Sequence, residues 1–230
     1  EASTRRTESS SSSPRDDSPP PMTTVSTSTV STSTRTAAAT FSTPPAGTSA
    51  TIGRYLRFQG TATRLAVVDP ERSVFCDYYA NGDPTVTAEG GSDVEGIGRP
   101  RVEPSFVPGV IDRMIRVPNA ASYAAMRVLE RLVGRRYGGS TGTDFCGALQ
   151  IACEMAARGE AGAIVTLACD AGDRYLDTYY SDAWLAAGGY DVAPHVERFE
   201  RSVAAAERDA LLTIAERLND RFRLLTGGSR

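Results

Sequence analysis

Two segments of the sequence place glycines and hydroxyl side chains at the start of a stretch with helical periodicity. They are AGTSATIG (46–53) and GGSTGT (138–143). The first N–H groups of a helix have no intrahelical partner and lie at the positive end of the helix dipole, so either segment is able to bind a phosphate or another anion. An ordinary helix cap is the simpler interpretation of each segment taken alone.

A third segment, DRYLDTYYSDAWL (173–185), mixes acidic and aromatic side chains after an apolar run. Such a mixture can line a pocket, but tyrosine and tryptophan in this setting are more often half-buried packing residues. Paired carboxylates such as Asp170 and Asp173 occur here, and nothing in their spacing marks out an acid–base pair.

The residue types do not support nucleophilic catalysis or metal binding. His195 is the only histidine and lies in a proline-flanked segment, so a Ser–His–Asp triad is not predicted. Cys76, Cys146, Cys153 and Cys169 form no CxxC pair and have no clustered histidine, which argues against a zinc site. The second and third of these cysteines share one apolar helical face and are predicted to be core residues. From residue types alone we therefore predict no catalytic residue and no metal ligand.

Composition narrows the class of protein further. All 25 basic residues are arginine, so the chain has no side-chain amine with which to form a Schiff base. Acidic and basic residues are interspersed at a net charge of −3, which predicts no nucleic-acid partner. No run of 18 apolar residues and no apolar leader occurs, so we predict neither a membrane span nor a secretory signal. Unpaired cysteines favour a reducing, cytoplasmic setting.

The chain divides near residue 46 by composition. Residues 1–46 are rich in Ser, Thr and Pro and include the run SSSSS. A tract of this kind buries too little apolar surface to offset the entropy of ordering, so a disordered tail is predicted. It is either a genuine tail or mistranslated upstream sequence. Residues 47–226 have the apolar content of a globular unit and are predicted to form the folded domain.

The folded part alternates between helical and strand patterns. Helices are expected over 49–58, 122–132, 145–158 and 196–225, strands over 64–70, 111–117 and 163–170, and a long loop over 81–109. The run AIVTLACD (163–170) is the clearest candidate for a strand buried on both faces. Alternation of helices with buried strands predicts an α/β fold with three layers, α/β/α, around a mostly parallel sheet.

The ordered set of motifs is more specific than any single one. GTSATIGRYLR, VVDPERSVF, EGIGRPRVEPSFVPGVIDR, GGSTGTDFCGALQIA and IVTLACDAGDRYLDTYYSDAWL follow one another over about residues 47–190. In this order they resemble the cysteine synthase and cystathionine β-synthase family, and within it the actinobacterial cysteine synthases and L-cysteine desulfhydrases. The resemblance implies the tryptophan synthase β-like fold (fold-type II) of pyridoxal-phosphate enzymes, with 47–226 as part of the larger domain.

The resemblance also implies an activity. Family members act at the β-carbon of L-cysteine or an O-activated L-serine. They either eliminate hydrogen sulfide to leave pyruvate and ammonia, or exchange the β-substituent to make cysteine. The expected cofactor is pyridoxal 5′-phosphate, the expected partner is a small amino-acid substrate, and a homodimer is possible. The sequence does not choose between the desulfhydrase and the synthase.

Five residues correspond to family positions around the cofactor. Gly47 and Thr48 match the end of the phosphate-binding loop, while prolines at 44 and 45 replace a glycine and a threonine and supply no N–H. Ser140 matches the serine that hydrogen-bonds the pyridine nitrogen. Gly96 and Gly98 match the loop that lines the substrate side of the cofactor and keeps space open there.

The family's Schiff-base lysine has no counterpart in this sequence. In the family it precedes the phosphate loop, where this chain has its Ser/Thr-rich segment. We therefore expect no turnover by the chain as written. A truncated or frame-shifted gene is one explanation, and a pseudoenzyme with a new tail is another. The alternative functions are a non-catalytic interaction module that retains the fold and an unstable remnant.

Overall fold

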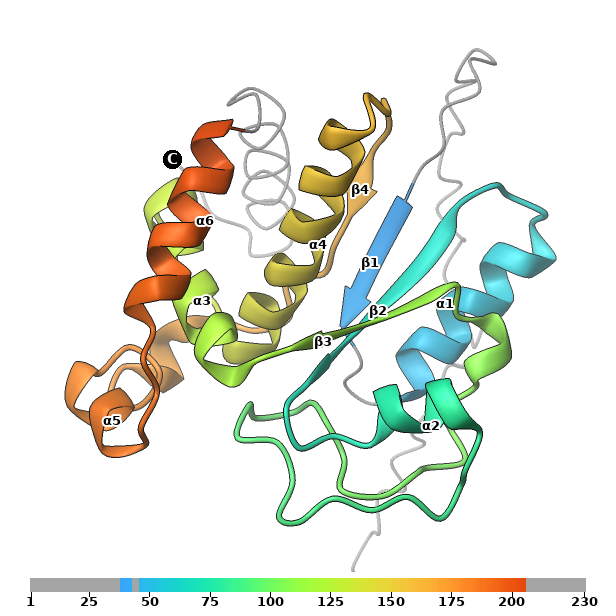
Figure 1. Ribbon diagram of the computed structural model, residues 1–230, viewed down its shortest axis with the longest axis horizontal. Coiled ribbons are helices and arrows are strands. Elements are labelled where there is room, and N and C mark those ends of the chain that lie inside the picture. The colour runs from blue at the N-terminus through green and yellow to red at the C-terminus, as the bar shows by residue number, and fades with distance from the viewer. Residues whose placement is uncertain (1–37, 43–45, 206–230) are drawn as a thin grey trace, which may run out of the picture. The chain divides into compact units, whose positions relative to one another are not determined.

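A computed structural model describes residues 38–42 and 46–205 of the 230-residue chain. Four parallel strands form one sheet in the order β3-β2-β1-β4 (Figure 1). The strands are β1 (Ala38–Ser42), β2 (Arg64–Pro70), β3 (Arg113–Val117) and β4 (Ile164–Val165). The parallel sheet agrees with the α/β class predicted from the sequence.

Helices connect and cover these strands. The α-helices are α1 (Ala46–Phe58), α2 (Phe75–Asn81), α3 (Asn119–Val133), α4 (Gly139–Ala157), α5 (Asp182–Ala187) and α6 (Ala193–Ala205). Two short 3₁₀ helices, η1 (Pro108–Val110) and η2 (Gly172–Tyr175), lie in the connections. The sequence pattern did not predict α2, whose seven residues include the half-buried aromatics Tyr78 and Tyr79.

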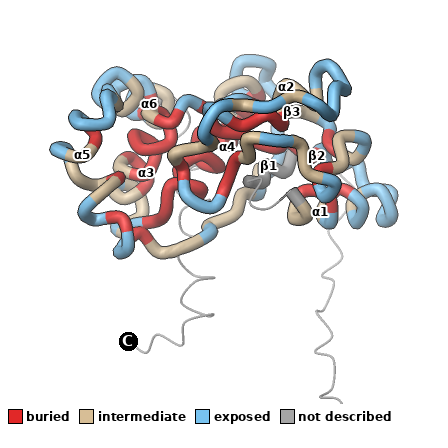
Figure 2. The backbone as a smooth tube through the Cα atoms, turned by 90° about the horizontal axis from the view of Figure 1, so that it is seen from below, coloured by how far each residue is buried: buried red, intermediate tan, exposed pale blue. Residues whose placement is uncertain are grey.

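Alternation along β2 shows why the fold has three layers. Ala66 and Val68 face the core shared with α3 and α4, whereas Leu65 and Val67 face the core shared with α1 and α2. All four side chains are buried, as expected for a strand covered on both faces. Buried positions are concentrated along β2, α3 and the first half of α4 (Figure 2). The predicted α/β/α layering is thereby confirmed.

Helix α4 begins earlier than its sequence predicts. GGSTGT was expected to be a turn, but the structure has Gly139 to Thr143 as the first turn of the helix. Small residues serve close packing here, because a Cβ on Gly142 would lie 2.3 Å from the carbonyl oxygen of Ser122 in α3. In the same way α1 begins at Ala46, so Gly47 and Thr48 lie in its first turn instead of preceding it.

The strand predicted over 163–170 is the largest error. Only Ile164 and Val165 are paired, with Ala38 and Ala39 of β1, and Val165 is 53% exposed. Among the described residues β4 pairs with β1 alone and therefore lies at the edge of the sheet. A strand buried on both faces usually lies inside a parallel sheet. The apolar run is present, but its expected burial is not.

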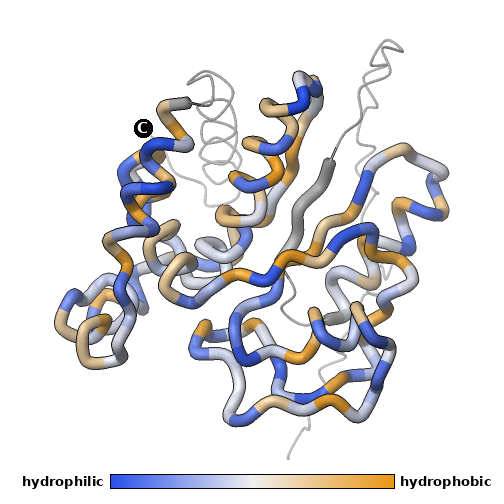
Figure 3. The backbone as a smooth tube through the Cα atoms, in the orientation of Figure 1, coloured by the Kyte–Doolittle hydropathy of each residue, from blue (hydrophilic) through white to orange (hydrophobic). Residues whose placement is uncertain are grey.

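The ends of the chain fall mainly outside the described residues. Strand β1 lies inside the predicted tail 1–46, where AATFS provides a short strand beside β2; the rest of that tail is not described. Of the helix predicted over 196–225, the structure describes α6 to Ala205, and its mixed apolar and charged residues are visible in Figure 3. In the described part of the chain, no helix has the length and apolarity required to cross a bilayer.

Candidate functional site

The N-termini of α1 and α4 both lie at the carboxyl edge of the parallel sheet (Figure 1). Helix α1 begins four positions after the last residue of β1. Two hydrogen bonds fix the start of α4 beside the segment that follows β4. The N–H of Gly138 donates to the carbonyl of Asp170 at 3.0 Å, and the N–H of Cys169 donates to Thr141 Oγ1 at 2.9 Å. Open parallel sheets bind ligands at this edge.

Ser140 lies in the first turn of α4 and is 6% exposed. One turn further along α4, Asp144 Oδ2 accepts a hydrogen bond from Cys169 Sγ at 3.7 Å. Burial raises the pKa of the Asp144 carboxyl well above its usual value. Desolvation also raises the pKa of the Cys169 thiol, to about 11. At neutral pH the Cys169 thiol is therefore expected to be protonated, and burial favours the uncharged form of the Asp144 carboxyl.

The first turn of α1 holds the two other residues matched to cofactor binding. Gly47 accepts a 2.8 Å hydrogen bond on its carbonyl from Thr51 Oγ1. Among the described residues, a Cβ added at Gly47 would meet no atom within 4 Å. The N–H groups of residues in a first helical turn have no intrahelical acceptor. Residues 43–45, which include both prolines of the matched loop, lie outside the described part.

The two loop glycines have different surroundings. Both adopt left-handed backbone, with φ of 86° at Gly96 and 74° at Gly98. A Cβ at Gly98 would lie 2.6 Å from Ser92 Cβ and 2.8 Å from Pro70 Cγ, whereas a Cβ at Gly96 would meet nothing within 4 Å. Gly98 thus permits close packing against the end of β2, and Gly96 is the position with open space beside it.

The structure brings this loop to the start of α4. A Cβ on Gly139 would lie 2.9 Å from Val94 Cγ1 and 3.0 Å from the ring of Tyr179. The residue before Ser140 is therefore packed against the loop that carries Gly96 and Gly98. Gly47 and Thr48 share the same edge of the sheet through α1. The five predicted positions thus gather at one edge, in two groups.

The aromatic side chains of segment 173–185 pack against other aromatic side chains, as the simpler interpretation held. Tyr179 stacks on Tyr123 and on Tyr175, with ring centroids 4.6 and 4.8 Å away. Trp184 stacks on Tyr190 at 5.6 Å. This aromatic cluster contacts the loop 93–98, because the hydroxyls of Tyr179 and Tyr190 hydrogen-bond Asp93 and the Tyr179 hydroxyl also accepts from the N–H of Glu95.

Sequence reasoning missed three residues beside these positions. Asp144 and Cys169 flank Ser140, and Asp93 anchors the glycine loop. An aspartate one helical turn after a matched serine was a usable signal for the first, since i and i+4 share a helix face. The cysteine and the loop aspartate are brought in by tertiary structure, which residue spacing does not reveal.

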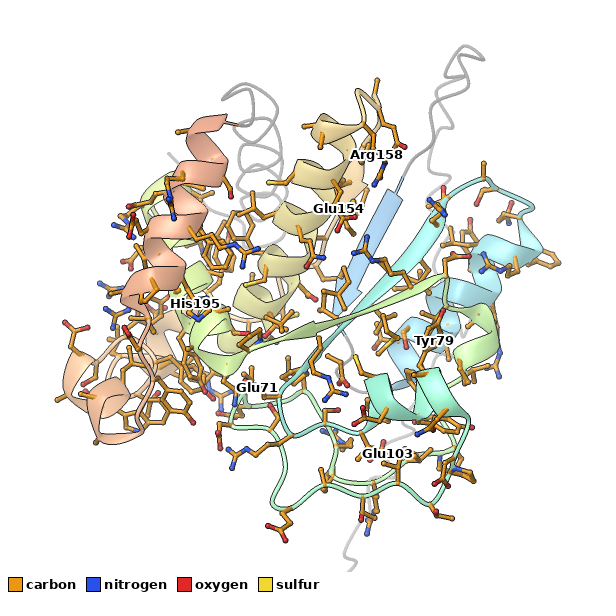
Figure 4. All side chains as sticks on the ribbon, viewed as in Figure 1. Glu71, Tyr79, Glu103, Glu154, Arg158 and His195 are labelled. Carbon is orange, nitrogen blue, oxygen red and sulfur yellow. The ribbon has the colours of Figure 1, made fainter. Side chains whose placement is uncertain are left out.

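A separate cavity of about 380 Å³ is lined by the end of β3, the start of α3, and helices α4 and α6. Its lining includes Glu154 of α4 and His195 of α6, which Figure 4 labels. Ser140 and the glycine loop do not line it. Within the described ranges no group of three or more His, Cys, Asp or Glu side chains is placed to hold a metal ion.

Comparison with known proteins identifies the relatives of this chain. No protein-family model matches it. An L-cysteine desulfhydrase of Mycobacterium tuberculosis is 54% identical over 159 residues, which are 68% of this chain and 43% of the relative. A cysteine synthase of Emericella nidulans is 29% identical over 168 residues, covering 70% of this chain and 44% of the relative.

Over part of its length, this chain is homologous to an L-cysteine desulfhydrase, to cysteine synthases and to a cystathionine β-synthase. The crystal structure of an O-ureido-L-serine synthase superposes with a TM-score of 0.51 over 66% of this chain and 47% of that protein, at 23% identity. That likeness confirms the predicted fold class. The chain spans less than half the length of the mycobacterial and fungal relatives.

The residues present fit the family cofactor in part. Free space beside Gly47 and a buried hydroxyl at Ser140 suit a phosphate and a ring nitrogen. Covalent attachment does not fit, because the 25 basic residues of this chain are all arginine and a guanidinium does not form a Schiff base. No side chain of this sequence is therefore available for covalent attachment of the cofactor.

Proposed function

We propose that this chain provides the larger-domain part of a pyridoxal-phosphate-dependent enzyme acting at the β-carbon of L-cysteine or an O-activated L-serine. The 54% identity to an L-cysteine desulfhydrase carries this proposal. It favours elimination, in which L-cysteine and water give hydrogen sulfide, pyruvate and ammonia. The cofactor, when bound, supplies the electron sink for loss of the β-substituent.

The proposed roles follow from the arrangement at the sheet edge. The first turn of α1, with Gly47 and Thr48, would hold the phosphate through backbone N–H groups. Ser140 would donate its hydroxyl to the ring nitrogen, since a neutral donor leaves that nitrogen without a full positive charge. Gly96 would leave room for substrate, whereas Gly98 allows the loop to lie close to Pro70.

By itself the chain is expected to hold no covalent cofactor. The purified protein, with its N-terminal amine blocked by acetylation, is incubated with pyridoxal phosphate and reduced with borohydride. Mass spectrometry should then show an unchanged mass, because no side-chain amine is available. A mass increase equal to one phosphopyridoxyl group would contradict this interpretation of the chain.

A fusion protein tests the activity itself. Residues 47–205 are joined to the part of the mycobacterial desulfhydrase that this chain does not cover, which would supply the amine. We expect the fusion to release sulfide and pyruvate from L-cysteine in equal amounts. Ser140→Ala in the fusion should lower kcat about tenfold or more, since a lost hydrogen bond to a buried polar group has that energetic scale. A folded fusion with no activity would contradict the proposed function.

The absence of lysine favours one second candidate, a non-catalytic module that binds a complete family enzyme through the retained fold. Immobilised chain should then capture purified mycobacterial desulfhydrase at micromolar concentration. No capture, together with an active fusion, would leave the enzymatic proposal as the better account.

A further inference from the structure

One aspartate is the meeting point of the elements around the glycine loop. Asp93 Oδ2 accepts hydrogen bonds from Tyr190 Oη at 2.5 Å and from Asn119 Nδ2 at 3.2 Å, and it forms an ion pair with Arg72. These three donors come from the segment after α5, the start of α3 and the turn after β2. Three donors on one carboxylate oxygen use most of its acceptor capacity.

The backbone of the same residue is also held. The carbonyl oxygen of Asp93 accepts from Tyr179 Oη at 2.9 Å and from Tyr123 Oη at 3.2 Å. The Tyr179 hydroxyl additionally accepts from the N–H of Glu95 at 2.9 Å, so it bridges two residues of the loop. Both tyrosines are buried. The loop is thus fixed immediately before Gly96 by side chains that have little freedom to move.

Arg72 adopts an unfavourable backbone conformation where it contacts Asp93. Its φ of 59° is the only left-handed value of a non-glycine residue in the described ranges. Such a conformation costs free energy and persists where surrounding contacts determine it. The neighbouring Glu71, labelled in Figure 4, accepts from the N–H of Asn119 at 2.9 Å and ties the same turn to α3. The turn after β2 is therefore shaped so that it reaches the loop.

We propose that Asp93 is a positioning residue that holds residues 94–98 against the first turn of α4, and so fixes the substrate side of the site. The inference rests on the proposed function, which makes this loop the substrate side of the site. The contacts of Asp93 described above support its positioning role. Val94 is the point of contact, since its Cγ1 lies 2.9 Å from the position that a Cβ of Gly139 would take. Release of Asp93 would let Gly96 move away from Ser140.

Hydrogen exchange of the full chain tests the holding of the loop. In Asp93→Ala the loop amides of Glu95 and Ile97 should exchange about tenfold or more faster, because hydrogen bonds to a charged group have at least that energetic scale. Amides of β2 should keep their rates. Asp83→Asn is the matched control, an exposed aspartate of the same long loop that bonds only to nearby residues. Equal acceleration in the loop and in β2, or none in either, would overturn the proposal.

A ligand readout separates positioning from a purely structural contact. The probe is pyridoxine 5′-phosphate, which has no aldehyde and so needs no lysine; the single tryptophan, Trp184, reports its binding by fluorescence. Bound probe should slow exchange at residues 94–98 in the wild type and not in Asp93→Ala, with Asp93→Glu restoring part of the protection. Probe binding without protection of the loop would overturn the inference while leaving the proposed function intact. No probe binding would count against the proposed function. Asp93 would then have a structural role only, even if Asp93→Ala accelerated exchange of the loop amides.

Discussion

At the scale of single residues, Asp144 is in an environment that disfavours its charge. It is fully buried one turn after Ser140, and its Oδ1 has no hydrogen-bond partner in the described structure. Burial raises the pKa of this carboxyl well above 3.8. The folded state therefore binds the proton more tightly than the unfolded chain does. Folding stability should fall as the pH rises from about 4 toward the folded-state pKa.

Replacement of this aspartate by asparagine tests that linkage. Asp144→Asn cannot ionise, so it should raise the free energy of unfolding at pH 8 by about 1–3 kcal/mol and change it little at pH 4. Urea unfolding at the two pH values measures the difference. Asp83→Asn, at an exposed position, should show no such pH-dependent gain. A loss of stability in Asp144→Asn at pH 8 would mean that the carboxylate is charged and paired in the folded state.

The opposite case is the ion pair between β3 and α4. Arg113 contacts Glu154 through two N–O distances of 2.5 and 2.8 Å, and this partner lowers the pKa of Glu154 to about 2. Because the folded pKa lies below the unfolded one, the stabilisation is present above about pH 4.5 and is lost as the pH falls through about 2. Arg113→Met should return the pKa of Glu154 toward 4.5, as measured by NMR titration of its side-chain carboxyl carbon. The stability cost should be only about 0.5–1 kcal/mol, since both side chains are partly exposed.

At the scale of elements, the contact of α3 with α4 depends on Gly142. A Cβ there would lie 2.3 Å from the Ser122 carbonyl oxygen and 2.7 Å from Met126 Cγ. Gly142→Ala should therefore destabilise the protein by about 1–3 kcal/mol through overpacking. Gly47→Ala is the matched control, a helical glycine with open space, and should be neutral or stabilising by about 0.5–1 kcal/mol. Thermal unfolding of both variants gives the comparison, and equal effects would contradict the close approach of the two helices.

The same helix pair shows what the sequence could and could not predict. Apolar spacing predicted α4 from Phe145 onward, with Phe145 and Leu149 as core residues. It also predicted β2 with both faces buried. It misread GGSTGT as a turn, because small residues chosen for interhelical contact have the same composition as turn residues. The gathering of Ser140 and the glycine loop followed from the family resemblance. The roles of Asp93 and Asp144 depend on contacts between segments far apart in the chain.

At the scale of the whole molecule, the sheet ends in an incompletely covered strand. The run AIVTLACD has the composition of a strand with a neighbour on each side, yet within the described ranges β4 pairs only with β1. The chain spans less than half the length of the mycobacterial and fungal relatives. An exposed apolar sheet edge is also a site at which copies of a chain associate.

We therefore expect concentration-dependent association through the β4 edge. Val165→Lys places a charge on an edge residue that is 53% exposed, and should weaken association several-fold without changing the cooperative unfolding of the monomer. Leu176→Lys changes a comparably exposed apolar residue, 43% exposed, away from the strands and should leave association unchanged. Sedimentation velocity over a hundredfold range of protein concentration distinguishes the two variants. If both substitutions weaken association equally, the driving force is general surface hydrophobicity; if neither does, the predicted dimer uses another surface.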